Sequence, residues 1–70
     1  MYICWIMKRF KDKEIKMYYG GYLDLKVFGL ASQFTEFKED AKKFKTQDEL
    51  KKELKQMSES VEKWTIEKVE

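Results

Sequence analysis

Histidine and proline are absent from this chain of 70 residues, and cysteine and arginine occur once each. Without histidine the chain lacks the commonest metal ligand and the side chain whose charge changes nearest neutral pH. A single cysteine excludes an intramolecular disulfide and, without histidine, the ordinary structural zinc sites. Cys4 is expected to be a buried, inert residue rather than a nucleophile, because its apolar neighbours supply no activating base. We therefore predict no catalytic residue, no metal site and no cofactor.

Long apolar runs are absent as well. No stretch approaches the roughly 20 apolar residues that a membrane-spanning helix needs. The apolar run over residues 2–7 is too short for the core of a signal peptide, and a lone cysteine is typical of a reducing compartment. We expect a soluble protein of the cytoplasm with no membrane partner.

Charged and aromatic residues, in contrast, are abundant. The 15 basic and 13 acidic residues give a net charge of +2, and the excess of positive charge lies in the first half of the chain. The 2 tryptophans, 4 tyrosines and 5 phenylalanines are more than one small core can hold. Some of these rings should therefore lie on the surface or in an interface.

The spacing of apolar residues changes near Lys45. Residues 2–10 are apolar on both faces of an extended chain and predict a central strand, and residues 15–19 alternate after a polar turn at residues 11–14. These two segments predict a β-hairpin.

Gly20 and Gly21 are the strongest turn signal in the chain. Alternating residues 22–27 follow them, which favours a two-residue hairpin loop between a second and a third strand. A bulge within one long strand is the alternative.

Residues 29–32 are expected to form a loop. We assign residues 34–44 as irregular with a turn of helix, although a short edge strand at 34–37 followed by a helical turn at 39–43 also fits.

Thr46 begins the clearest element. Thr46 and Glu49 have the spacing of a capping box at the start of a helix, which should run to about residue 59 before a weak stop at 58–60. Trp64 and Ile66 then face inward from a final strand. The helix has a narrow apolar stripe, formed by Leu50, Leu54, Met57 and Val61.

These elements predict a single α+β domain over residues 1–70. It should contain a small antiparallel sheet of three to four strands, in the order β-β-β-α-β, with one helix packed on one face. Because the apolar stripe is narrow, we expect the other face of the sheet to be open.

Three aromatic residues, Tyr18, Tyr22 and Phe28, fall on the strand face opposite to Met17 and Leu23 in this register. Exposed aromatic side chains with a charged rim are typical of a protein-binding site. The same residues could instead form a second core layer, covered by the loop over residues 29–37. An open face of this kind could also support a homodimer.

The first hairpin carries a cluster of basic residues around Phe10. Cations beside aromatic rings can bind phosphate and stack on bases, so a small nucleic-acid-binding module is the alternative function. Lysines at a turn and strand edge also prevent edge-to-edge pairing without any ligand. The basic residues are Lys8, Arg9, Lys11, Lys13 and Lys16.

Three short motifs carry a resemblance to a known group of proteins. They are Tyr-Tyr-Gly-Gly-Tyr at residues 18–22, Glu-Asp-Ala-Lys-Lys-Phe-Lys-Thr at residues 39–46, and Trp-Thr-Ile-Glu at residues 64–67. Together with the order of elements, they resemble the small accessory proteins of phages and prophages in low-GC Gram-positive bacteria. The resemblance implies a strand-strand-helix-strand fold, in which Ala41 and Phe44 pack under the helix and Thr46 caps it.

The resemblance also implies a function. Such phage proteins often act in host takeover or counter-defence, and some are anti-CRISPR inhibitors that occupy a surface of a host enzyme. The expected function is therefore that of a non-enzymatic binding protein, an inhibitor or modulator of a bacterial host protein.

Overall fold

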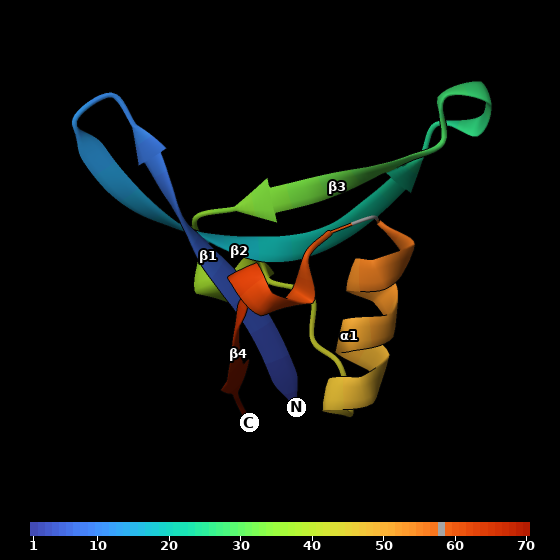
Figure 1. Cartoon of the computed structure of the whole chain (residues 1–70). Helices are drawn as coiled ribbons and strands as arrows, with labels where there is room; N and C mark the ends of the chain where they lie inside the picture. The colour runs from blue at the N-terminus through green and yellow to red at the C-terminus, as the bar shows by residue number, and fades with distance from the viewer. Residues whose placement is uncertain (58) are drawn as a thin grey trace.

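The chain folds into a four-stranded antiparallel sheet with one α-helix. The computed structural model describes residues 1–57 and 59–70. The strand order is β3-β2-β1-β4, and α1 packs on one face (Figure 1). The predicted α+β fold and order of elements are confirmed. The elements are β1 (Tyr2–Phe10), β2 (Lys13–Asp24), η1 (Lys26–Phe28), β3 (Leu30–Thr35), η2 (Lys38–Asp40), α1 (Gln47–Gln56), η3 (Val61–Lys63) and β4 (Thr65–Lys68).

The first hairpin forms as predicted, with a tighter turn. Phe10 pairs with Lys13, so the loop consists of Lys11 and Asp12 alone. Lys11 adopts the left-handed backbone conformation, with φ 57°, that short hairpin loops require.

Gly20 and Gly21 form a bulge inside β2, and the predicted hairpin loop at this position is wrong. Tyr19 pairs with Phe34 whereas Gly21 pairs with Gln33, so two glycines face one residue of β3. Gly21 has φ 108°, a conformation that disfavours residues with a side chain. Because a bulge adds one residue, the alternation of side chains is shifted beyond it.

The second hairpin turns later than predicted, at η1. β2 ends at Asp24, and residues 30–32 of the segment predicted as a loop over residues 29–32 belong to the edge strand β3. The turn is closed by a backbone hydrogen bond of 2.7 Å from the Leu25 N–H to the Gly29 carbonyl. The favoured assignment of residues 34–44 as irregular with a turn of helix is therefore wrong for residues 34 and 35, which end this strand. The alternative, a short edge strand followed by a helical turn, is closer to the observed structure.

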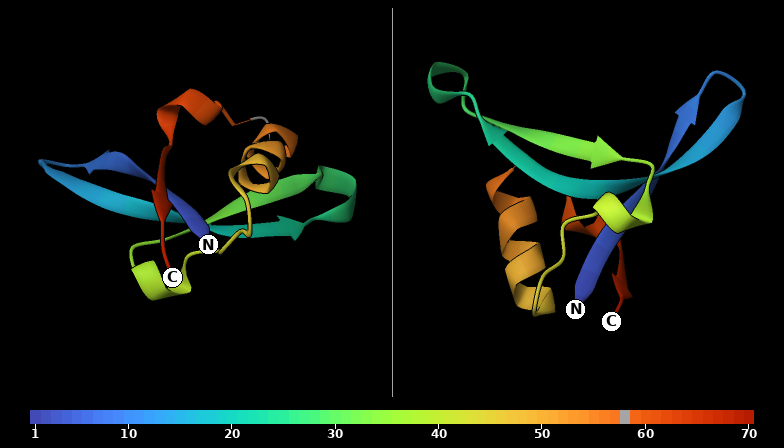
Figure 2. Two further views of the ribbon diagram at one scale, coloured as in Figure 1. Left: turned by 90° about the horizontal axis from the view of Figure 1, so that it is seen from below. Right: turned by 180° about the vertical axis from the view of Figure 1, so that it is seen from behind.

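Residues 42–44 pass between β1 and β2. These strands pair only from Trp5 and Tyr18 outward, toward the hairpin loop. Where they diverge, the Lys42 N–H donates to the Tyr19 carbonyl at 2.9 Å, and Tyr2 and Phe44 exchange two backbone hydrogen bonds. The chain thus crosses from the face that carries η2 to the face that carries α1, and Figure 2 shows these two elements on opposite sides of the sheet.

α1 begins as predicted and ends early. The Thr46 side chain accepts a hydrogen bond of 3.2 Å from the Glu49 N–H, which confirms Thr46 as the N-cap. The helix ends at Gln56, three residues before the predicted end, and Ser58 of the predicted stop lies outside the described residues.

The core has two parts, one on each face of the sheet. The cluster under α1 contains Cys4, Tyr19, Phe44, Leu50, Leu54 and Trp64, with Ile66, Met57 and Val61 packed against it. The inward positions of Trp64 and Ile66 and the helical stripe are thereby confirmed. The cluster on the other face contains Ile3, Tyr18 and Ala41, with Trp5 and Val69 packed against it.

The second cluster corrects two expectations. Ala41 lies on the face away from α1, so only Phe44 packs under the helix as the resemblance implied. The face opposite the helix is also not fully open, because the segment around η2 covers Tyr18 and Ile3.

Alanine at Gly21 and at Gly20 should have different effects on stability. A Cβ at Gly20 meets its nearest atom at 3.6 Å, an ordinary contact, whereas Gly21 has a positive φ. We expect Gly21→Ala to lower the free energy of unfolding by about 1–2 kcal/mol, and Gly20→Ala to cost clearly less. Urea denaturation of both variants measures this difference, and equal losses would contradict the role of the bulge.

Candidate binding site

Tyr18 does not belong to an exposed aromatic patch. Its side chain is only 7% exposed and packs with Ile3 and Ala41 in the second core cluster. The alternative interpretation of Tyr18 as part of a second core layer is therefore correct, although the covering segment lies around Ala41 rather than at residues 29–37.

Tyr22 lies on the other face of the sheet from Tyr18. The bulge shifts the alternation by one residue, so Tyr22 faces α1 together with Tyr19. The Lys42 amine lies 5.3 Å from the centre of the Tyr22 ring and binds Glu53 of α1 at 2.7 and 2.9 Å. Tyr22 is 42% exposed and flanks this ion pair.

Phe28 lies far out on the second hairpin, in η1, with 87% of its surface exposed. It shares an exposed tip with Val27, which is 92% exposed. The predicted site of Tyr18, Tyr22 and Phe28 is thus divided among the core, the α1 face and a hairpin tip.

The predicted basic cluster is divided as well. Lys16 lies on the face away from α1, with its amine 4.0 Å from the Trp5 ring centre and 3.9 Å from a Glu67 carboxylate oxygen. Glu67 also accepts hydrogen bonds from Lys38 and, at 3.2 Å, from Trp5 Nε1. The hydrogen bond from Lys38 lowers the pKa of Glu67. Lys16 therefore takes part in a structural network.

Lys8 lies on the α1 face of the hairpin. Its amine is 5.1 Å from the centre of the Phe34 ring, within the range of a cation–π contact. Lys11 lies near the tip, 6.0 Å from the Phe10 ring. Across the described residues, no acid lies within ion-pair distance of Lys8, Arg9, Lys11 or Lys13.

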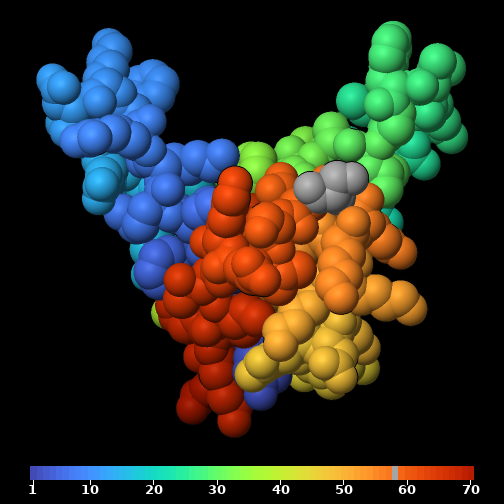
Figure 3. Space-filling model, viewed as in Figure 1, coloured from blue at the N-terminus to red at the C-terminus, as the bar shows by residue number. Residues whose placement is uncertain are grey.

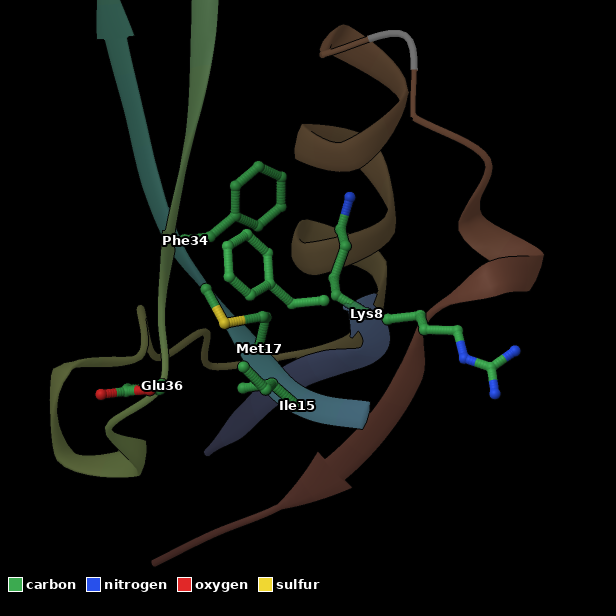
Figure 4. Close-up of a pocket in the computed structure, with 7 residues that line it drawn as sticks. Lys8, Ile15, Met17, Phe34 and Glu36 are labelled. Carbon is green, nitrogen blue, oxygen red and sulfur yellow. The ribbon is translucent and has the colours of Figure 1, made fainter. Parts of the chain in front are cut away.

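An apolar groove lies beside Lys8, on the α1 face of the first hairpin. It has a volume of about 460 Å³ and is formed mainly by four apolar side chains with three charged residues around them. Figure 3 shows the first hairpin (blue) projecting from the body of the molecule, and Figure 4 shows the lining. The lining residues are Lys8, Arg9, Phe10, Ile15, Met17, Phe34 and Glu36.

The groove lies beyond the part of the hairpin that the α1-side core covers. The 10 residues of α1 span about 15 Å, whereas the 9 residues of β1 span about 30 Å. The helix covers the half of the hairpin around Cys4 and Tyr19 and leaves Ile15 and Met17 half-buried beyond it. The α1 face of the hairpin thus continues past the core as an apolar surface.

One wall of the groove is fixed to the core. Phe34 stacks on Trp64 with a ring-centre distance of 5.8 Å and an interplanar angle of 5°, and Trp64 meets Tyr19 edge-on at 6.0 Å. Both Tyr19 and Trp64 are buried. The Phe34 wall is therefore held in place before any partner arrives.

The charge pattern of the sequence points to Lys8, Arg9 and Phe10, but Ile15, Met17 and Phe34 were not predicted as site residues. Ile15 and Met17 alternate with Tyr19, which marks them as the α1 face of the hairpin. A comparison of that long face with the short predicted helix could have identified the uncovered part. Phe34 was hidden by the incorrect assignment of residues 34–44.

The titratable groups of the core are protected from solvent. Burial, and secondarily the charge of Glu53, raises the pKa of the Cys4 thiol to about 12. The Tyr19 hydroxyl donates a hydrogen bond of 2.7 Å to Glu53, and burial together with this bond raises its pKa. Cys4 is fully buried, as predicted.

Alanine substitutions should separate the buried tyrosine from the exposed phenylalanine. Tyr18→Ala removes a ring from the second core cluster and should cost about 3 kcal/mol of unfolding free energy or more. Phe28→Ala should change it by less than about 0.5 kcal/mol. Urea denaturation checks both values, and a tolerated Tyr18→Ala would contradict the burial of this residue.

Cys4 should make the protein less stable in alkali. The folded protein keeps the thiol proton up to about pH 12, whereas an unfolded chain loses it near the ordinary value of 9.0. Its contribution is therefore complete below about pH 9 and is lost as the pH rises toward 12. We expect the stability advantage of the native chain over Cys4→Ala to shrink between pH 9 and 11 in urea denaturation. A constant advantage over that range would contradict the raised pKa.

No family model, curated protein or solved structure matches the chain. Within the described residues, no helix has the length and apolar character needed to cross a bilayer.

Proposed function

We propose that this chain is a non-enzymatic binding protein that docks on a bacterial host protein through the groove of the first hairpin. The observation that carries the proposal is the continuous apolar surface of Phe10, Ile15, Met17 and Phe34, beside Lys8, which has no ion-pair partner among residues 1–57 and 59–70. Apolar surface of this kind, rimmed by charge, is typical of interaction sites.

The groove combines a fixed wall with an exposed anchor. The Phe34 wall rests on buried Trp64, so little ordering is needed there upon binding. Phe10 is 65% exposed, and its ring can enter a pocket of a partner. A few such aromatic side chains usually supply most of the energy of an interface.

The proposed biological role is that of a phage-derived inhibitor or modulator acting in the cytoplasm of the bacterial cell. This part rests on the resemblance to phage and prophage accessory proteins. A counter-defence factor, such as an anti-CRISPR protein, needs only to occupy a surface of its target. Stoichiometric docking through a hairpin groove is compatible with that mode of action.

Nucleic-acid binding is the second candidate, favoured by the contact of Lys11 with the exposed Phe10 ring. The division of the cations weighs against it. Lys8 lies on the α1 face, and Lys16 is engaged with Trp5 and Glu67 on the opposite face, so they do not form one phosphate-binding track.

Homodimerisation is tested by sedimentation at two concentrations, in which a dimer should appear as a mass that rises with concentration.

A photo-crosslinking experiment tests the proposed docking surface. Benzoylphenylalanine is placed at Phe10, beside the groove, or at Phe28, on the other hairpin, and each protein is irradiated in a Gram-positive host lysate. Both positions are exposed, so both proteins should fold. We expect a defined protein adduct, identified by mass spectrometry, from position 10 and not from position 28.

The captured protein is then purified and titrated with the native chain and with two alanine variants. Phe10→Ala should weaken binding by about tenfold or more, whereas Phe28→Ala should leave the affinity unchanged. Equal loss in both variants, or adducts with nucleic acid alone, would contradict the proposal.

A further inference from the structure

We infer that the groove accepts an acidic, apolar peptide segment, with a carboxylate of that segment placed against Lys8. This inference rests on the proposed function and names the chemistry of the partner at the same site. Three features of the groove support it: its charge, its apolar lining and the arrangement of its charged residues.

The groove has a cation on its own face. Lys8, Arg9 and Glu36 line it, and Lys8 points to the α1 face, whereas Arg9 follows it in the strand and points to the opposite face. In the described part of the chain, neither cation has an acid within ion-pair distance. A carboxylate from outside the molecule would therefore pair with Lys8 without displacing an existing ion pair.

The position of Lys8 makes such a pair stronger than an ordinary surface contact. Its side chain runs beside the Phe34 ring, with the amine 5.1 Å from the ring centre (Figure 4). An apolar side chain of the partner, packed on Phe34 and Met17, would exclude water from this contact. Charges attract more strongly when water is excluded between them.

The charges of the groove are also arranged asymmetrically. Figure 4 shows Lys8 beside the Phe34 ring and the Glu36 carboxylate pointing away on the opposite side. A segment with its carboxylate toward Lys8 gains attraction, whereas the reversed segment loses it. The groove thus favours one orientation of the bound segment.

The lining favours a peptide over a nucleic acid. Ile15 and Met17 form the part of the groove on β2, and aliphatic side chains are suited to the apolar residues of a peptide. Phosphates would need several cations along one face, and the hairpin divides Lys8 and Lys16 between two faces. A volume of about 460 Å³ is in the usual range for small binding pockets, about 300–1,000 Å³.

Two synthetic peptides and an oligonucleotide test the inference with the full chain. One fluorescein-labelled decapeptide alternates leucine or phenylalanine with glutamate, the second has lysine in place of each glutamate, and the third probe is single-stranded DNA. Fluorescence anisotropy at about 0.15 M salt, where exposed charges more than about 8 Å apart are largely screened, gives the three affinities. We expect the acidic peptide to bind at least about tenfold more tightly than the basic peptide.

Matched charge reversals locate the effect. Lys8→Glu with Arg9→Glu reverses the groove cation and its neighbour in β1, and Lys11→Glu with Lys13→Glu makes the same change in net charge at the hairpin tip, outside the groove lining. The first pair should abolish or invert the preference for the acidic peptide. The second pair should leave the ratio of affinities within about twofold, because distant surface charges are screened.

Several outcomes would overturn the inference. Equal binding of both peptides would leave the groove as a docking site but remove its acidic preference, and so would equal effects of the two charge reversals. If neither peptide binds while crosslinking at position 10 captures a host protein, the acidic segment is wrong and the proposed function stands. DNA binding that both charge reversals weaken alike would favour the nucleic-acid function instead.

Discussion

The backbone of β2 is shifted by one residue at Gly20 and Gly21, and both faces of the molecule depend on that shift. On one side of the bulge Tyr18 faces η2, and on the other side Tyr22 faces α1. β2 curves in this region (Figure 1), and it diverges from β1 where residues 42–44 pass between the two strands. The helix can therefore follow on the face opposite to η2, and each face obtains its own small core.

The two cores leave the first hairpin half covered. The cluster under α1 ends where the helix ends, and the second cluster is closed by the segment around Ala41. Beyond both clusters, β1 and β2 continue as a two-stranded projection. Its α1 face carries apolar side chains of the kind found in a core. The binding groove is thus a part of the α1 face that neither core cluster covers.

The second hairpin has a different character. Its turn is closed by backbone hydrogen bonds, with Lys26 at φ 60° and Gly29 at φ 89°, and it holds Val27 and Phe28 in solvent. Phe28 has no fixed wall beside it comparable to the Phe34 wall of the groove. This difference makes Phe28 a suitable control position.

Local patterns in the sequence determined the features that depend on neighbours a few residues apart. These are the strand over residues 2–10, the first hairpin, the N-cap at Thr46 and the inward orientation of Trp64. The tertiary structure decided the rest. Paired glycines allow a turn or a bulge, and the pairing with β3 selects the bulge. This pairing places Tyr19 opposite Phe34, whose ring stacks on Trp64. That long-range choice buried Tyr18, moved Tyr22 to the other face and placed Phe34 in the groove.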